Sequence, residues 1–491
     1  MAPTAVQNGG SAGQELSKAI DEIGVQLTLS KDVLDKILER FHERMFHGLA
    51  NDNQNMLMIP TFVTGVPDGS EKGTYLALDL GGTNLRVCEV ILDGKGSFTM
   101  KQQKYKVSDE LKRGKAKTLF TFIAQSVKTF LESESKTGSA SSGEELLLGF
   151  TFSFPCEQTA IDQGTLIKWT KGFDADDAIG QEVVGLLQSC LNELGVKVRV
   201  NSLVNDTVGT LLAHGYQSKG PALLGGIFGT GTNGAYVELR KNITKLQVDD
   251  PLEPAPTYMI VNAEWGGFDD ERAILPVTPF DNQVDREAIR PRHHAFEKMI
   301  SGMYLGEISR MIILSLVDRL LLFKGFSSVK MNTQYAFDTA YMSAIMDDKK
   351  DASDNSSPTY KVLAETMEIK PENISAEDIK AVRRVCDIVG KRAARLSAVA
   401  VAAVIKHHQE EVSPDNKEEV YNLGVDGSVV EYLPNFLDWV REALREMVGT
   451  ETEKKTKFGF AKDGSGIGAA LCALQASKQE KDHHHPHLHK N

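Results

Sequence analysis

The chain has 491 residues, of which 41% are hydrophobic and 25% charged, and this composition excludes a disordered, collagen-like or coiled-coil protein. At roughly 100–200 residues per domain, the length predicts two or three lobes, each able to bury a core. The formal net charge of −12 disfavours nucleic acid and anionic membranes as main partners, because an acidic surface repels both. A small phosphorylated ligand remains compatible with this charge, since a local pocket can oppose the global field.

Cysteine usage and the lack of long apolar segments indicate the cytoplasm as the compartment of this protein. The five cysteines are odd in number and form no CxxC pair, which predicts reduced thiols in a cytoplasmic protein. The first residues have neither the basic nor the apolar region of a signal peptide, and no apolar run approaches the ~20 residues of a membrane span. We therefore expect no membrane span and no glycosylation of the sequon at Asn205.

The N-terminal part of the chain is predicted to be helical. Residues 1–14 have the small and polar composition of a flexible tail. From residue 15 to 49 the pattern is mostly helical, and between Val33 and Phe46 apolar residues recur three and four positions apart. Ser30 is a suitable N-cap for this amphipathic helix.

Further along the chain, two polar stretches separate the regular elements. Residues 132–143 and 347–358 are rich in charged residues, Ser and Gly and are predicted to be surface loops. Ser375-x-x-Asp378 has the spacing of a capping box and predicts the start of a long helix that reaches about His407. Between Ala393 and Ile405 this helix is apolar nearly all round, so we expect it to be buried. The His-rich run at the end of the chain can bind metal ions weakly, and nothing around it fixes a catalytic geometry.

Three segments place a turn rich in Gly, Thr, Asn or Ser after an apolar strand. They are residues 75–90 around Asp79, residues 224–238 around Thr230, and residues 421–430 around Asp426 with the later run 462–470. Such turns let backbone N–H groups converge on an anion, and Asp79 at a strand end can hold a hydrated Mg²⁺ beside a triphosphate. Each turn alone also fits a tight hairpin, but the set in this order fits a nucleotide site better. The sequence contains no Walker motif, no dinucleotide GxGxxG and no protein-kinase motif set.

Two strand ends carry polar residues that suit an acceptor site. Ser153 and Pro155 end an apolar strand, and Asp206 follows another apolar strand and begins a helix. A carboxylate at a strand end beside a cleft can act as a general base, although the same position also fits an N-cap aspartate. Glu264 and Glu297 each lie beside an aromatic residue, a combination that can bind sugar hydroxyls, although solvated helix charges are the alternative.

Together these motifs resemble the hexokinase family in their order and spacing. The resemblance covers residues 19–477 and includes Leu-Asp-Leu-Gly-Gly-Thr-Asn, Trp-Thr-Lys-Gly-Phe, Asn-Asp-Thr-Val-Gly-Thr, Glu-Trp-Gly-Gly-Phe and Lys-Asp-Gly-Ser-Gly. Within the family, the details around residues 228–234, 424–432 and 461–472 are most similar to fungal glucokinases. The resemblance implies an α/β fold of the actin-like ATPase (ribonuclease H-like) group, with two lobes around a central cleft.

The resemblance also implies roles for individual residues. Asp206 matches the catalytic base, and Lys171 is suited to stabilise charge on the phosphoryl group during transfer. The implied sugar site comprises Ser153, Pro155, Thr170, Lys171, Asn205, Asp206, Asn233, Glu264 and Glu297. The implied ATP site comprises Asp79, Gly81, Gly82, Thr83, Asn84, Lys104, Thr230, Gly427, Ser428 and Ser465. Mg²⁺ is expected with ATP, held largely through water, with Asp79 as the nearest protein carboxylate.

The implied lobes are not consecutive in sequence. After the tail at 1–14, residues 15–66 are expected to pack on the large lobe, 67–206 to form the small lobe and 207–462 the large lobe. Residues 463–477 are expected to form a helix that returns to the small lobe, and 478–491 a His-rich tail.

The predicted activity is ATP-dependent phosphorylation of glucose at its 6-hydroxyl, the first step of glycolysis. A broad-specificity hexokinase that also accepts mannose and fructose is the main alternative. A non-catalytic glucose sensor and an actin- or chaperone-like ATPase remain as alternatives on the same fold. The expected partners are glucose and MgATP, without nucleic acid or a membrane span, and the chain is expected to be a monomer or a homodimer.

Overall fold

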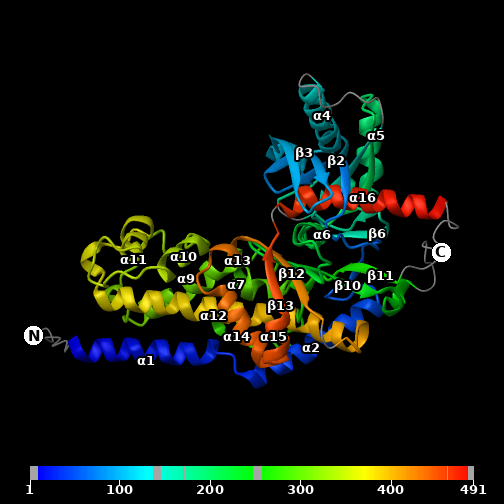
Figure 1. The fold of residues 1–491 in the computed structure, drawn as a ribbon. Coiled ribbons are helices and arrows are strands. Elements are labelled where there is room, and N and C mark those ends of the chain that lie inside the picture. Colours follow the sequence, from blue (N-terminus) through cyan, green and yellow to red (C-terminus); the bar gives the residue numbers. More distant parts are fainter. Residues whose placement is uncertain are drawn as a thin grey trace, which may run out of the picture.

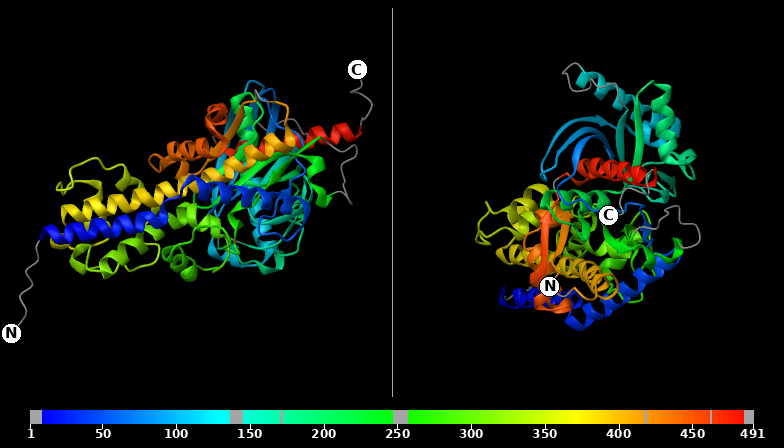
Figure 2. Two further views of the ribbon diagram at one scale, coloured as in Figure 1. Left: turned by 90° about the horizontal axis from the view of Figure 1, so that it is seen from below. Right: turned by 45° about the vertical axis from the view of Figure 1, so that its right-hand side comes forward.

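The protein consists of two lobes, with the smaller one above the larger in Figure 1. The computed structural model describes residues 9–135, 145–169, 172–246, 257–416, 419–461 and 463–484. Each lobe is built on its own β-sheet, and Figure 2 shows the protein from below and turned by 45° about the vertical axis. In the described part of the chain, none of the helices combines the length and the apolar composition needed to cross a bilayer.

The small lobe contains a five-stranded sheet in the order β4-β3-β2-β5-β8. Its strands are β2 (Lys72–Leu80), β3 (Asn84–Asp93), β4 (Phe98–Lys106), β5 (Leu146–Phe152) and β8 (Val198–Val204). Strands β2, β3 and β4 are antiparallel, while β5 and β8 run parallel to β2. A short hairpin of β6 (Cys156–Ala160) and β7 (Gln163–Leu166) lies outside this sheet.

Alternation along β2 sends its side chains to two different cores. Leu76, Leu78 and Leu80 pack with residues of α4 (Ala116–Ser135) and α5 (Val183–Glu193), whereas Ala77 packs with residues of α16 (Gly464–His484). Because side chains alternate between the two faces of a strand, Asp79 shares the face of Ala77, on the α16 side. This arrangement directs a carboxylate toward the cleft.

The large lobe repeats the same strand plan. Its sheet has the order β1-β11-β10-β9-β12-β13, in which β9, β10 and β11 are antiparallel and β12 and β13 run parallel to β9. The strands are β1 (Ile59–Pro60), β9 (Leu224–Phe228), β10 (Thr232–Leu239), β11 (Tyr258–Asn262), β12 (Tyr421–Asp426) and β13 (Thr456–Phe460). The β2–β3 hairpin of one lobe therefore corresponds to the β9–β10 hairpin of the other, and these hairpins carry the first two glycine-rich turns.

Long helices form the rest of the large lobe. The main ones are α1 (Gly9–Leu27), α2 (Lys31–Ala50), α7 (Pro279–Glu287), α9 (Gly302–Asp318), α10 (Thr339–Met346), α12 (Ala376–His407) and α14 (Phe436–Val448). The short helices of this lobe are α8 (Ala295–Ile300), α11 (Pro358–Lys361), α13 (Ser428–Tyr432) and α15 (Thr450–Lys455), whereas the short helix α3 (Asp109–Arg113) packs on the small lobe. The predicted caps are confirmed, because Ser30 accepts from the Val33 N–H and Ser375 and Asp378 form the capping box of α12. The apolar part of α12 is buried as expected.

Two predicted tails are shorter than expected within the described residues. Helix α1 already begins at Gly9, before the predicted end of the tail at residue 14, and it packs beside α12 as Figure 2 shows. Helix α16 continues to His484, beyond the predicted end of the last helix at residue 477. Apolar side chains between Leu16 and Phe62 contribute to the large-lobe core, and those between Ile467 and Leu474 pack with Ala77 of the small-lobe sheet.

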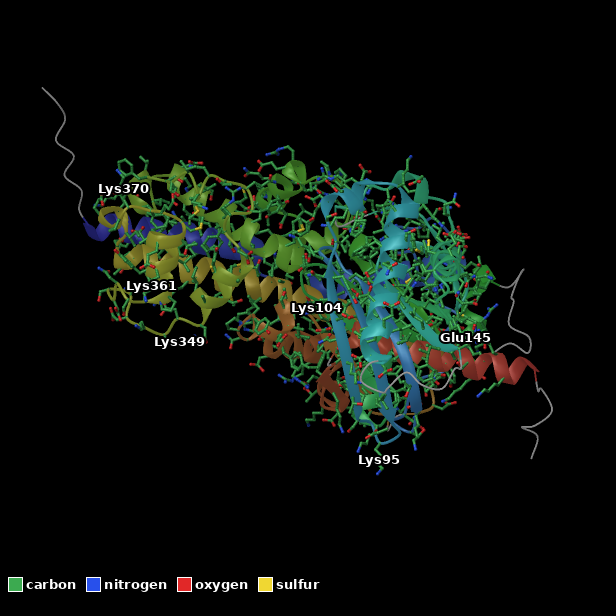
Figure 3. The ribbon with its side chains drawn as sticks, turned by 90° about the horizontal axis from the view of Figure 1, so that it is seen from above. Lys95, Lys104, Glu145, Lys349, Lys361 and Lys370 are labelled. Carbon is green, nitrogen blue, oxygen red and sulfur yellow. The ribbon has the colours of Figure 1, made fainter. Side chains whose placement is uncertain are left out.

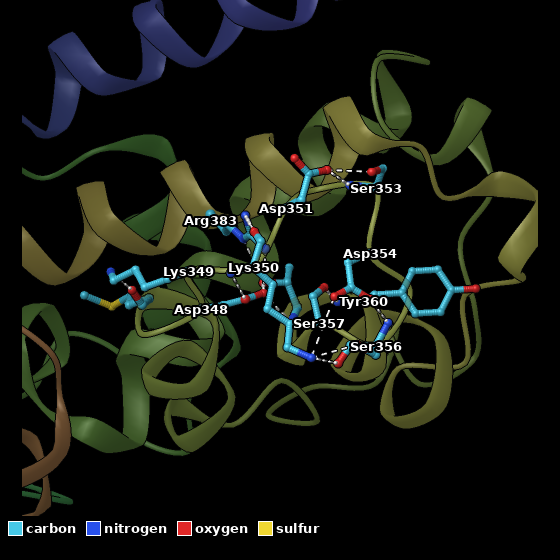
Figure 4. Close-up of polar contacts among 12 residues, drawn as sticks. Asp348, Lys349, Lys350, Asp351, Ser353, Asp354, Ser356, Ser357, Tyr360 and Arg383 are labelled. Carbon is cyan, nitrogen blue, oxygen red and sulfur yellow. Dashed lines mark hydrogen bonds and ion pairs between the residues drawn. The ribbon is translucent and has the colours of Figure 1, made fainter.

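The loop predicted at 347–358 is confirmed as a series of turns without strands (Figure 4). Asp351 and Asp354 each accept backbone N–H groups two residues ahead, from Ser353 and Ser356. Arg383 of α12 closes the loop by donating to Asp348 at 2.6 Å. Most of the other predicted loop, at 132–143, lies outside the described residues, while α4 extends to Ser135.

The two lobes meet at a tight helix crossing. Helix α6 (Asp206–Ser218) lies between the lobes and crosses α16 beneath the small-lobe sheet. A Cβ atom added to Gly468 would lie 2.2 Å from Cα of Gly209, so only glycine allows this approach. The crossing fixes the start of α6, which carries Asp206, relative to both sheets.

Candidate active site

A cleft of about 260 Å³ lies between the lobes, where the strand ends and the glycine-rich turns meet. It combines residues of both sheets with the starts of α6 and α16, and its lining comprises Asp79, Leu80, Gly81, Ser153, Asp206, Thr210, Ile227, Asp426, Gly427 and Ser465. Six of these were predicted from the sequence: Asp79, Gly81, Ser153, Asp206, Gly427 and Ser465. The cleft therefore brings together residues that are up to several hundred positions apart.

Asp206 lies at the first position of α6, directly after β8. Its backbone N–H donates to the Ser153 hydroxyl at 3.3 Å, and its carbonyl accepts from the Thr210 hydroxyl at 2.9 Å. The N-cap is Asn205, whose side-chain oxygen accepts from the backbone N–H and the hydroxyl of Thr207 at 3.0 and 2.7 Å. The alternative of Asp206 as the N-cap is therefore wrong, and Asp206 lines the cleft beside Ser153.

The first glycine-rich turn closes the β2–β3 hairpin. The Gly81 N–H donates to the Asn84 carbonyl at 2.9 Å, and the Asn84 amide donates to the Thr83 hydroxyl at 3.1 Å. Thr83 and Asn84 are exposed, while Gly81 and Gly82 are half-buried. The hairpin alternative is thus correct as a description of the turn, and the same turn lies at the cleft.

Strand register aligns three charged residues across this hairpin. Asp79 of β2 pairs with Arg86 of β3, which in turn pairs with Lys104 of β4. Directly paired residues in antiparallel strands share one face, so these side chains form a row leading from the cleft. Figure 3, which views the protein from above, shows Lys104 at the edge of the small-lobe strands toward the long helices of the large lobe.

Arg86 is a site residue that the sequence reasoning missed. Its Nη2 atom lies 2.5 Å from Asp463 Oδ1, 2.6 Å from Ser465 Oγ and 3.4 Å from Asp79 Oδ2. The guanidinium thus joins the first turn to the start of α16. Arg86 could have been found from the register of the β2–β3 hairpin, because this register places Arg86 opposite Asp79.

The second and third turns lie side by side because β9 and β12 are neighbours. Gly427 has φ 118°, and a Cβ there would lie 2.5 Å from the Phe228 carbonyl group, so the two turns touch through their backbones. The Gly302 N–H donates to Gly229 at 2.7 Å and anchors the second turn to α9. Thr230 and Ser428 are both exposed beside this contact.

Asp426 is a second missed residue, although it belongs to a segment that the sequence singled out. It ends β12, and its Oδ1 atom accepts from the Gly427 N–H at 2.7 Å. Burial raises the pKa of Asp426, and the nearby carboxylates of Asp206 and Asp463 raise it further. Asp79, Asp206 and Asp426 all line the cleft, although among the described residues no three acidic, His or Cys side chains lie close enough together to hold a metal ion by themselves.

The large-lobe residues of the implied sugar site form one hydrogen-bond network. Asn233 of β10 donates to Asn262 at 2.8 Å and to Glu264 at 3.2 Å, and Asn262 donates to the same Glu264 oxygen at 2.9 Å. Glu297 of α8 accepts from the backbone N–H of Thr232 at 3.0 Å. Asn262, which lies between the predicted residues, was missed by the sequence reasoning.

The electrostatics of this network are unusual for surface carboxylates. Burial raises the pKa of Glu264, and the carboxylates of Asp206 and Glu297 act in the same direction, against the Asn262 hydrogen bond. Glu264 adopts φ 53°, a left-handed conformation that costs free energy in a residue with a Cβ. His294 lies 3.3 Å from Glu297, and this contact raises the pKa of the imidazole. These features do not fit the alternative of solvated helix charges.

The small-lobe side of the implied sugar site is described only in part. Thr170 and Lys171 lie outside the described residues. The residue before them, Trp169, is buried among Phe152, Phe154 and Phe173, and its indole N–H donates to the Ala175 carbonyl at 2.7 Å. The Pro155 carbonyl accepts from the Ile167 N–H at 2.9 Å and fixes the strand end that carries Ser153.

Comparison with known proteins agrees with this architecture. Two family models, both described as hexokinase, match residues 19–216 and 223–475. The glucokinase of Aspergillus niger is 44% identical over 462 residues, which cover 88% of this chain and 92% of that protein. Hexokinase-1 of Schizosaccharomyces pombe is 40% identical, with 94% and 92% covered.

Solved structures agree as well. The hexokinase from Schistosoma mansoni complexed with glucose has a TM-score of 0.80 and 34% identity, and the match covers 95% of this chain and 99% of that one. The predicted family, its likeness to fungal glucokinases and the two-lobed α/β fold with a central cleft are therefore confirmed. The chain belongs to the hexokinase family.

Proposed function

We propose that the protein transfers the γ-phosphoryl group of ATP to the 6-hydroxyl of glucose, with Asp206 as the general base. The observation that carries this proposal is the position of Asp206 in the cleft, beside Ser153 and Asp426 and within electrostatic reach of Glu264. The base thus lies between the residues proposed for the sugar and those proposed for the nucleotide. Phosphoryl transfer depends mainly on positioning and electrostatics, and this arrangement supplies both.

The sugar is proposed to bind through neutral amides and carboxylates. Asn233, Glu264 and Glu297 are already oriented by hydrogen bonds to neighbouring groups, so little ordering is needed when a sugar binds. Ser153 and Asn205 lie next to the base, because the Ser153 hydroxyl accepts from the Asp206 backbone N–H and Asn205 directly precedes Asp206. Thr170 and Lys171 remain part of the proposal, with Lys171 stabilising charge on the phosphoryl group.

The nucleotide is proposed to bind where the glycine-rich turns face the cleft. Backbone N–H groups of such turns suit phosphate oxygens, and Asp79 and Asp426 suit Mg²⁺, so the residues fit MgATP. When bound, Mg²⁺ would neutralise charge on the phosphates and orient them. Arg86 holds the first turn against α16, which keeps Asp79 in place.

The proposal also covers the cellular compartment of the protein and the range of sugars that it phosphorylates. All five cysteines are buried free thiols, which supports a reducing, cytoplasmic environment. A hexokinase that also uses mannose and fructose is the second candidate, because identity to a named hexokinase is nearly as high as to a named glucokinase. Steady-state kinetics with glucose, mannose and fructose in parallel would separate the two.

The role of Asp206 is tested by Asp206→Ala. We expect at least about a 10³-fold loss of kcat, because both the base and its positioning are removed. Asp109→Ala, at an exposed position of α3 in the small lobe, is the control and should keep normal turnover. Near-normal turnover of Asp206→Ala would exclude Asp206 as the base, and a wild-type protein that forms no glucose 6-phosphate would exclude the function.

A further inference from the structure

The loop between α7 and α8 reaches from the large lobe to the small lobe. The loop is flanked by Val284 and Ala295, which belong to the large-lobe core, whereas Trp169 belongs to the small-lobe core. Nevertheless, Nη2 of Arg290 in this loop lies 3.3 Å from the Trp169 carbonyl oxygen, to which it donates. A hydrogen bond therefore joins the two lobes at the edge of the sugar site.

A buried cluster of charged residues, Arg272, Asp285 and Lys298, holds the backbone of this loop. Asp285, at the end of α7, accepts from Lys298 at 2.8 Å, from Arg272 at 2.6 Å and from the Arg292 backbone N–H at 3.1 Å. Lys298 also donates to the Arg290 carbonyl at 2.6 Å, so the backbone of Arg290 is held by a side chain that is 7% exposed. The backbone of Arg290 is thus already fixed, which reduces the loss of conformational entropy that its side-chain hydrogen bond must offset.

The same cluster connects this loop to the proposed sugar residues. Lys298 directly follows Glu297 on α8, and Glu297 accepts from the Thr232 N–H beside Asn233. On the other side of the hydrogen bond, the Trp169 ring is packed against Phe154 and Phe173, so the carbonyl acceptor is also fixed. Arg290 therefore joins the loop that precedes α8, the helix of Glu297, to the segment after β7, in which Trp169 packs against Phe154, the residue after Ser153.

We propose that Arg290 is a positioning residue that fastens the two lobes together over the sugar and thereby sets the affinity for glucose. The inference rests on the proposed glucose kinase activity. Because a cleft must close around the sugar to exclude water, a contact between the lobes increases the closed fraction. The apparent affinity scales with that fraction, so loss of the contact raises KM for glucose. Once glucose is saturating, the closed complex forms in either case and kcat is retained.

The test compares three full-length variants with the wild-type enzyme. Arg290→Gln removes the charge and the reach of the donor, Arg290→Lys keeps a cationic donor, and Arg286→Gln removes an equal charge from the exposed end of α7. We expect Arg290→Gln to raise KM for glucose about three- to tenfold, the size typical of a charged hydrogen bond at a partly exposed site. Arg290→Lys should recover part of this loss, and Arg286→Gln should not change KM for glucose.

Two further measurements separate the proposal from a general structural or charge effect. KM for MgATP should stay within about twofold in all variants, because the hydrogen bond lies on the sugar side. Thermal unfolding without ligand should be unchanged, while the rise in melting temperature on adding a fixed glucose concentration should be smaller for Arg290→Gln, since weaker binding stabilises less.

Three outcomes would overturn the inference. These are an unchanged KM for glucose in Arg290→Gln, an equal rise in Arg286→Gln, or a loss of kcat with KM unchanged. Each of these can be observed only if the wild-type enzyme phosphorylates glucose, so failure of the proposed function is seen separately, in the wild-type control.

Discussion

Replacing Arg392 by Met tests how the large lobe holds α7 against α12. Arg392 is a fully buried side chain of α12, and its two terminal nitrogens donate to the two Asp281 oxygens of α7 at 2.7 and 2.6 Å. Asp281 also accepts from the backbone N–H and the hydroxyl of Thr278, which completes the capping box of α7. The variant would therefore leave a buried carboxylate without its cation.

The expected loss follows from this geometry. Removing one partner of a buried ion pair costs about 3–5 kcal/mol, because the remaining charge stays desolvated. With a slope of about 3 kcal/mol per M urea, the unfolding midpoint should fall by about 1 M or more. The transition can be followed by tryptophan fluorescence, since Trp265 and Trp439 both pack in the large-lobe core. Arg384→Met is the control, because Arg384 lies on the same helix in an exposed ion pair with Asp21.

The dependence on pH provides a second check. Burial alone would raise the pKa of Asp281, but Arg392 and Thr278 hold it below its ordinary value. The stability from a depressed carboxyl pKa is present above the unfolded pKa of about 3.9 and is lost as pH falls through the folded pKa. The difference between wild type and Arg392→Met should thus be fully present at pH 7 and shrink as the pH falls below about 4. A loss below about 1 kcal/mol at pH 7, or a difference that grows on acidification, would refute this reasoning.

Three other changes test the helix crossing and the cleft. Gly468→Ala should destabilise the protein by about 1–3 kcal/mol in urea unfolding, since the added Cβ would lie 2.2 Å from Cα of Gly209. The control Gly13→Ala should not destabilise the protein, because no atom lies within 4 Å of the added Cβ. The affinity for glucose should fall as pH drops through the raised pKa of Glu264, because the protonated carboxyl loses an acceptor oxygen, and titration calorimetry should show no such fall in Glu264→Gln. Asp426→Asn should lower kcat/KM for MgATP about tenfold. The variant should also bind Mn²⁺ more weakly in the nucleotide complex, as measured by electron paramagnetic resonance. Unchanged Mn²⁺ binding would contradict a role of Asp426 near the cation.

The sequence allowed prediction of the features that depend on local patterns. The cap at Ser30, the capping box at Ser375 and the buried stretch of α12 each depend on neighbouring residues, and the structure has all three. The glycine-rich turns were also found, because positive φ and close backbone approach leave glycine as a visible requirement, as at Gly427.

The missed residues depend on contacts between distant segments. Arg86 becomes a site residue only through strand register and the return of α16, which brings Asp463 and Ser465 to it. Asp426 lies in a turn that was recognised, yet its place in the cleft depends on the parallel pairing of β12 with β9. Asp206 and Asn205 are both good N-cap residues, so only the backbone path after β8 decides that Asn205 is the cap.

The return of α16 has a consequence for how the chain folds during synthesis. One face of the small-lobe sheet is covered by Ile467, Ala470 and Leu471 of α16, which follow β8 by more than half the length of the chain. At about 5–20 residues per second, the ribosome needs roughly tens of seconds to add this helix after the sheet has emerged. During that time Cys88, Val90 and Leu92 lack their final covering, so we expect the nascent small lobe to depend on chaperones until the last helix is released.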